Sequence, residues 1–122
     1  MENQKIIPII MGSLLACTAW MDPFADHVRA GNAKQAEKSY QAALEEYRMA
    51  GRHRAPRKSR EILEFNRAAE KAGMGDTAGA IEGFTRVASS EEPELQKKAL
   101  FNLGNLHQRA GNRKAAAESY IA

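Results

Sequence analysis

The sequence predicts an all-α chain built as a solenoid of about three helical hairpins, the last one truncated. After Pro23 it is rich in Ala, Glu, Lys, Gln and Arg, and it has no run of alternating β-branched residues, so helix is favoured throughout. Residues 27–42 also recur as residues 107–122, with ten of sixteen positions identical. Recurrence of helical segments is typical of solenoids, in which each hairpin buries its apolar face only against a neighbour.

An uncharged apolar stretch, residues 6–20, lies near the start of the chain. It is shorter than the roughly 20 apolar residues of a membrane span and has the length of a signal-peptide core. We therefore expect residues 1–20 to be a signal peptide, a lipoprotein leader or a membrane anchor, and the protein to be exported to the periplasm or anchored in the bacterial cell envelope. Residues 14–17 resemble the bacterial lipobox, which makes Cys17 a lipidation candidate; the competing interpretation is cleavage after Ala19, with Cys17 discarded.

The helix boundaries are predicted from Gly-Asn and Gly-Asp pairs. Gly31-Asn32, Gly75-Asp76 and Gly111-Asn112 are each followed by Ala and then an aromatic residue at four-residue steps. Glycine suits the left-handed end of one helix, and Asn or Asp caps the next. Asp22-Pro23 and Pro93 are also typical of helix starts. The resulting helices are roughly 23–30, 32–49, 59–73, 76–88, 93–110 and 112–122.

These helices group into repeats of about 22–49, 59–88 and 93–122 within a domain spanning 21–122. The glycines are 44 residues apart in the first interval and 36 in the second. We assign the excess in the first interval to a basic insertion loop at 50–58. The last repeat stops at its second helix, so Ala115, Ala116 and Tyr120 are expected on an exposed face.

The last repeat resembles the tetratricopeptide-repeat (TPR) signature W-x-x-L-G-x-x-Y…A-x-x-x-F, with Leu in place of Trp and His in place of Tyr. The matching residues are Leu100, Leu103, Gly104, His107, Ala116 and Tyr120. The resemblance implies a groove lined by the first helix of each pair, in which a partner peptide lies. The groove positions are Ile62, Phe65 and Asn66 in the middle repeat and Lys98, Phe101, Asn102 and Asn105 in the last.

The groove asparagines have two interpretations. Asn66, Asn102 and Asn105 can each hold the backbone of a bound peptide, because an amide side chain both donates and accepts hydrogen bonds. They can equally brace their own or adjacent helices. Both interpretations stay open from the sequence.

Residues 14–122 also resemble the TPR proteins of bacterial aerotolerance-type (Bat) operons. The particular features are Trp20, the Asp-Pro-Phe-Ala-Asp run at 22–26 and the Phe-Asn-Leu-Gly-Asn run at 101–105. This resemblance implies a protein of the membrane or periplasm that works beside von Willebrand factor A-domain proteins and a MoxR-type ATPase. It makes a von Willebrand factor A-domain membrane protein a candidate partner. The Arg-rich segment has no counterpart in the family pattern.

Six of the 18 Lys and Arg residues lie between Glu46 and Glu61 with no acidic residue among them. Without them the chain has 12 basic and 15 acidic residues, so its formal charge of +3 is local and nucleic-acid binding is not expected. An alternative function uses segment 48–60 to dock a membrane-surface protein on anionic lipid. The other interpretation is a solvated loop.

The sequence contains no arrangement that indicates catalysis. There is no Gly-rich phosphate loop, no H-E-x-x-H and no Ser-His-Asp candidate in a plausible setting. A single cysteine excludes an internal disulfide and a multi-cysteine metal site, and the repeat register assigns His27 and His107 to equivalent places in different hairpins. We therefore expect no catalytic residue, no metal and no cofactor, and predict a non-enzymatic scaffold or adaptor that binds a partner protein or peptide.

Overall fold

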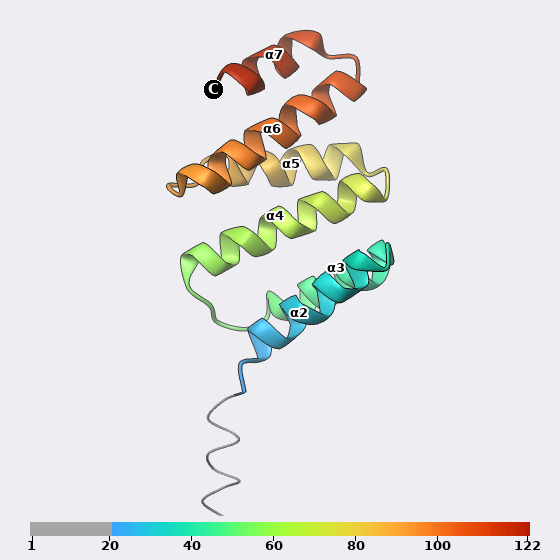
Figure 1. Cartoon of the computed structure of the whole chain (residues 1–122), viewed down its shortest axis with the longest axis vertical. Coiled ribbons are helices and arrows are strands. Elements are labelled where there is room, and N and C mark those ends of the chain that lie inside the picture. The colour runs from blue at the N-terminus through green and yellow to red at the C-terminus, as the bar shows by residue number, and fades with distance from the viewer. Residues whose placement is uncertain (1–20) are drawn as a thin grey trace, which may run out of the picture.

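A computed structural model describes residues 21–122, and this part of the chain folds into six α-helices without a strand (Figure 1). The all-α prediction is confirmed. The predictions for the leader, including lipidation of Cys17, concern residues outside the described range. The helices pair as α2 (Pro23–Ala36) with α3 (Tyr40–Ala50), α4 (Arg57–Gly73) with α5 (Thr77–Val87), and α6 (Pro93–Arg109) with α7 (Arg113–Ile121).

The three helical hairpins stack along the long axis of the molecule, with α2, α4 and α6 following one another (Figure 1). Each helix packs most extensively on its own hairpin partner, and α3 on α4 and α5 on α6 join successive hairpins. The core has two parts. One surrounds Tyr47 and Leu63 between the first two hairpins, and the other surrounds Phe84 and Leu103 between the last two.

The starts of four helices, α2, α5, α6 and α7, follow the sequence-based expectation. Asp22 caps α2, where its carboxylate accepts a hydrogen bond from the Ala25 N–H at 3.2 Å, and Pro23 lies in the first turn. Pro93 likewise opens α6. Asp76 and Asn112 cap α5 and α7 through hydrogen bonds of 3.0 and 3.1 Å to backbone N–H groups three residues on.

The three hairpin turns share one geometry, which fixes the repeat register. Each contains one residue at positive φ: Lys38 at 58°, Gly75 at 86° and Gly111 at 78°. In each turn the N–H of the following residue donates to a carbonyl five residues back, at 2.8–2.9 Å. The turns therefore correspond at intervals of 37 and 36 residues, where the sequence comparison had given 44 and 36.

The expected helix boundary at Gly31 was wrong. Helix α2 runs through this glycine to Ala36, and Gly31 is buried against the ring of Tyr47, where an added Cβ would overlap the ring. Gly104 has the same relation to Tyr120. Gly31 thus serves close packing rather than chain reversal, and its counterpart is Gly104 rather than Gly111.

The corrected register also changes the description of the basic segment. Ala50 ends α3 and Arg57 begins α4, so the stretch outside helices is 51–56. The stretch between α5 and α6, residues 88–92, is nearly as long. The basic residues therefore occupy an ordinary connection together with the ends of the flanking helices.

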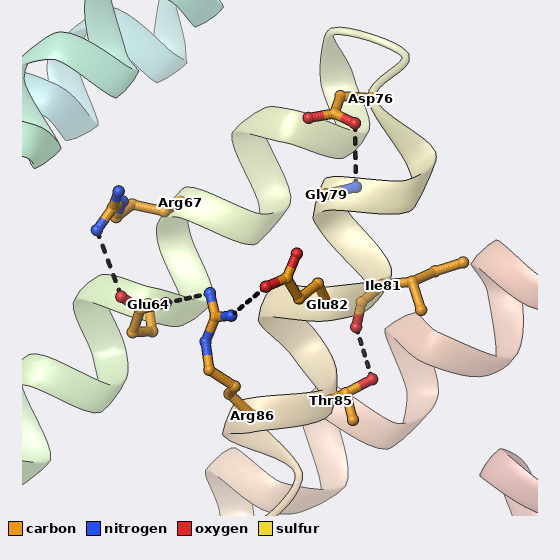
Figure 2. A network of polar contacts seen from close by, with 8 residues as sticks. All are labelled: Glu64, Arg67, Asp76, Gly79, Ile81, Glu82, Thr85 and Arg86. Carbon is orange, nitrogen blue, oxygen red and sulfur yellow. Dashed lines mark hydrogen bonds and ion pairs between the residues drawn. The ribbon is translucent and has the colours of Figure 1, made fainter.

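A polar network holds the second hairpin together on its surface (Figure 2). The guanidinium of Arg86 on α5 bridges Glu64 on α4 at 3.1 Å and Glu82 on its own helix at 3.0 Å. Glu64 also pairs with Arg67 at 3.3 Å. The hydrogen bond to Glu64 raises the pKa of Arg86 above its ordinary value. These contacts fix α4, which contributes most to the site described next.

Candidate partner-binding groove

Two cavities open on the first helices of the hairpins. The cavity between α4 and α6 has a volume of about 400 Å³, and the cavity between α2 and α4 about 320 Å³. The first is lined by Lys58, Ile62, Phe65, Asn66, Glu92, Pro93, Glu94, Leu95 and Lys98. The second is lined by Asp22, Phe24, Ala25, Val28, Arg29, Arg54, Ala55, Pro56, Ser59, Ile62 and Leu63.

Ile62 lines both cavities and is 40% exposed. Because this one side chain belongs to both walls, the two cavities adjoin, and together they cross three successive first helices. We call the pair of cavities the groove. Its lining combines apolar side chains with several charged ones, a combination found in sites that bind peptides or small molecules.

The side chains of the groove are held in place from behind. Phe65 packs edge-on against Phe84 of α5, with ring centroids 5.1 Å apart. Next to Ile62, Leu63 is 4% exposed and belongs to the core around Tyr47. Leu63 therefore anchors this part of α4 in the core, while the neighbouring Ile62 lines the groove.

The structure brings four of the seven predicted groove residues into the groove, and Ile62 and Phe65 are two of them. Asn66 and Lys98 line the cavity between α4 and α6. Phe101, which is 61% exposed, lies instead beside Tyr120, with ring centroids 6.1 Å apart. Asn102 donates a hydrogen bond from Nδ2 to the carbonyl of Lys98 at 2.8 Å.

Asn105 points toward the second helix of its hairpin. Its Oδ1 accepts a hydrogen bond from the Tyr120 hydroxyl at 2.7 Å. In the first hairpin, Asn32 receives the same bond from Tyr47, also at 2.7 Å. The amide oxygen of Asn105 therefore helps to hold α6 against α7. Asn66, in contrast, makes no side-chain hydrogen bond with another described residue.

The alignment of the repeats within the sequence missed the contribution of α2 to the groove. Phe24 and Val28 line the cavity between α2 and α4, and Val28 occupies the place in its hairpin that Phe65 and Phe101 occupy in theirs. The 80-residue register hid this correspondence. The 37-residue interval between the turns at Lys38 and Gly75 would have revealed it.

Half of the basic segment is engaged in ion pairs with acidic residues. Arg48 pairs with Glu45, and Lys58 pairs with Glu92 at 3.7 Å. Arg57 bridges Glu61 at 3.1 Å and Glu91 at 3.4 Å. The pairs to Glu91 and Glu92 tie the start of α4 to the connection before α6.

The remaining basic side chains lie in different surroundings. Arg54 lines the groove, whereas Arg60 lines a small separate depression with Glu61 and Arg86. A hydrogen bond of 2.5 Å from the Ser90 hydroxyl, followed by the Arg57 guanidinium, lowers the pKa of Glu61 and keeps this depression partly anionic. Arg54 and Arg60 of the basic segment therefore line different cavities.

A buried acid lies at the joint between the first two hairpins. Glu70 on α4 is 1% exposed, and its Oε2 has no hydrogen-bond partner among the described residues. Burial raises the pKa of Glu70 above its ordinary value. Burial, followed by the charge of Glu70, raises the pKa of the fully buried Tyr47 to about 12. This pair lies away from the groove lining and concerns stability rather than binding.

His27 does not correspond to His107. It occupies the place of Leu100, and its Nδ1 lies 2.8 Å from Glu46 Oε2, with the ring stacked 5.7 Å from that of His53. Within residues 21–122, no group of three or more His, Cys, Asp or Glu side chains is placed to hold a metal ion. None of the helices in this range has both the length and the apolar character needed to cross a bilayer.

Comparison of the sequence with models of known protein families finds no match, and comparison with curated proteins finds no significant relative. The resemblances described above therefore rest on the residues quoted for them. The groove is interpreted below from its own geometry.

Proposed function

We propose that this chain is a non-enzymatic scaffold of TPR-type helical repeats that binds a segment of a partner protein in the groove. The observation that carries the proposal is the pair of adjoining cavities that share Ile62. A segment crossing α2, α4 and α6 would place apolar side chains in both cavities. Peptide segments commonly bind in this way, with a few apolar anchors supplying most of the binding energy.

The TPR-type assignment is supported by three equivalent hairpins. Each packs a small residue of its first helix near an aromatic residue of its second: Gly31 with Tyr47, Ala68 with Phe84, and Gly104 with Tyr120. Each also buries an alanine four residues before the aromatic one, and in the third hairpin this is Ala116, which had been expected on an exposed face. The intervals of 37 and 36 residues are close to the standard repeat of about 34 residues.

The cellular setting is proposed from the sequence. The apolar stretch at 6–20 favours export, with the protein in the periplasm or anchored to the envelope membrane. The Bat-type resemblance favours a von Willebrand factor A-domain membrane protein as the partner. Docking on anionic lipid through segment 48–60 is less favoured, because Arg48, Arg57 and Lys58 are in ion pairs.

Quantitative capture from envelope extract with matched variants tests the proposal. Ile62→Lys places a charge where both cavities meet, and Ala33→Lys places the same charge at an exposed position of α2 that lines neither cavity. We expect the protein captured by the unaltered chain to fall at least about tenfold with Ile62→Lys and to be retained with Ala33→Lys. Melting temperatures within a few degrees of each other should show that both variants fold. Equal capture by the two variants would remove the groove as the binding site.

A further inference from the structure

The acidic side chains that line the groove are all engaged within the chain itself. The carboxylate of Asp22 caps α2 by accepting a hydrogen bond from a backbone N–H at 3.2 Å. Glu92 pairs with Lys58 at 3.7 Å. Glu94 pairs with Lys97 at 3.8 Å. Each acid of the lining therefore already lies beside a cation or a backbone donor.

The cationic side chains of the lining are only partly engaged. Two of the four, Lys58 and Arg29, are in ion pairs. The other two, Lys98 and Arg54, are exposed and make no ion pair or side-chain hydrogen bond with another residue in the range 21–122. Lys98 lines the cavity between α4 and α6, and Arg54 lines the cavity between α2 and α4. Each of the two cavities that share Ile62 thus contains one cation without an acidic partner among the described residues.

Asn66 is a neutral polar group of the groove, and its role differs from that of the two cations. It is half-buried in the lining of the cavity between α4 and α6. Its amide can both donate and accept hydrogen bonds, so it suits the backbone of a bound segment whatever the sequence of that segment. Lys98 and Arg54 can only donate. Discrimination between partner segments by charge therefore falls to these two side chains.

A carboxylate is the complement of both cations. Each cation shares its cavity with apolar side chains, Lys98 with Phe65 and Arg54 with Val28. A segment that fills the apolar parts displaces water near the cation, which strengthens its attraction to an acid and its repulsion of a base.

We propose that the partner segment is acidic on both sides of its apolar residues, with one carboxylate beside Lys98 and another beside Arg54. This inference rests on the proposed function and adds to it the charge of the segment that the groove selects.

Selection from a phage library of random peptides on the full chain tests the proposal. The peptides are displayed at the N-terminus of the coat protein, so they have no free carboxyl terminus and every acid in them is a side chain. Clones are kept when they bind the unaltered chain and lose binding to Ile62→Lys, which restricts them to the groove. We expect these clones to carry Asp or Glu on both sides of apolar residues. Selection on the double variant Arg54→Glu/Lys98→Glu should enrich Lys and Arg at the same places instead.

A matched pair of double variants separates the two cations from the overall charge. Synthetic peptides of the selected sequences, with amidated ends, are titrated by fluorescence anisotropy. Arg54→Glu/Lys98→Glu should weaken their binding at least about tenfold, since each attraction becomes a repulsion. Arg52→Glu/Lys114→Glu reverses two exposed cations that line neither cavity, and should change binding by less than about twofold. Circular dichroism should show equal helix content in both.

Three results would contradict the inference in distinguishable ways. Clones that depend on Ile62 but show no enrichment of acids would overturn it and leave the proposed function standing. Equal weakening by the two double variants would also overturn it, because the attraction would then depend on overall charge. The absence of any clone that depends on Ile62 would overturn the proposed function together with this inference.

Discussion

Tyr47 in the first hairpin and Tyr120 in the third have the same local contacts in different surroundings. Each ring lies against a glycine of the preceding helix, and each hydroxyl donates to an asparagine at 2.7 Å and approaches a glutamine at 3.3–3.4 Å. Tyr47 is nevertheless fully buried, whereas Tyr120 is 45% exposed. The difference comes from α4, which lies over Tyr47 and has no counterpart over Tyr120 among residues 21–122.

This comparison separates what a hairpin supplies from what its neighbour supplies. The glycine-to-ring contact and the hydroxyl hydrogen bonds form within one hairpin. The exclusion of water from the ring requires the next one, as expected of a solenoid in which stability is largely a sum of hairpin and interface contributions. Substitutions at equivalent positions should therefore differ in effect according to the neighbour.

Truncating the two tyrosines should give the largest difference. We expect Tyr47→Ala to lower the free energy of unfolding by about 3–5 kcal/mol, because it leaves a cavity between two hairpins. Tyr120→Ala should cost about 1–2 kcal/mol, since much of that ring already contacts water. Urea unfolding followed by circular dichroism measures both. Similar losses would mean that α4 contributes little to the environment of Tyr47.

The two glycines under these rings offer a second test. An added methyl group at either Gly31 or Gly104 would overlap the tyrosine ring. The Tyr47 ring is enclosed and cannot move aside, so Gly31→Ala should destabilise the protein by about 1–3 kcal/mol. The Tyr120 ring can swing toward solvent, and the helix preference for Ala, about 1 kcal/mol, should offset much of the remaining cost in Gly104→Ala. Thermal melts of both variants distinguish these outcomes; a larger loss for Gly104→Ala would contradict the comparison.

The joint that covers Tyr47 contains the buried acid Glu70, whereas the next joint has Leu106 at the same place. Burial raises the pKa of Glu70, so the folded protein retains a proton that the unfolded chain releases above its ordinary pKa of 4.5. The stabilising effect of this proton is present below pH 4.5 and is lost as pH rises through the folded-state pKa.

Glu70→Gln removes this dependence. At neutral pH we expect the variant to be more stable than the unaltered protein by about 1 kcal/mol, with the difference vanishing below pH 4.5. Urea midpoints measured across this pH range provide the test. A difference that is independent of pH would show that the carboxyl group does not change its ionisation on folding.

The smallest expected effect concerns the turns. Lys38 adopts a positive φ where the other two hairpins have Gly75 and Gly111. Lys38→Gly should raise stability by about 0.5–1 kcal/mol, because a side chain disfavours this conformation, and Gly111→Ala should lower it by about 1 kcal/mol. A change of about 1 kcal/mol should move the melting temperature by roughly 4–8 °C. A lower melting temperature for Lys38→Gly would mean that the lysine side chain makes stabilising contacts of its own.

The sequence predicted the elements whose signals are local. Asp22, Pro23 and Pro93 mark helix starts, and Gly75 and Gly111 mark turns, because each position needs a particular backbone or capping property. The first turn was misplaced because Lys38 carries no such signal, whereas Gly31-Asn32 imitates Gly111-Asn112. In the structure Gly31 is required by the ring of Tyr47, a long-range contact that no local pattern reveals.

The candidate site was predictable to a similar degree. Ile62, Phe65, Asn66 and Lys98 could be assigned to the groove once the last two repeats were aligned, because their interval of 36 residues was correct. The residues of α2 were missed because the interval between the first two repeats was taken as 44 residues, whereas their turns lie 37 residues apart. The ion pairs that join Arg57 and Lys58 to Glu91 and Glu92 could not be foreseen, since they depend on how two connections lie beside each other.

The central claim, that a partner segment lies across Ile62, is tested most directly by photo-crosslinking in the cells that produce the protein. A photoreactive amino acid replaces Ile62 in one version of the chain and the exposed Ala33 of α2 in another. We expect a discrete crosslinked protein from position 62 that is missing from position 33 and that disappears when Phe65→Lys is added in the groove. No crosslink at position 62, or the same product from both positions, would contradict the claim.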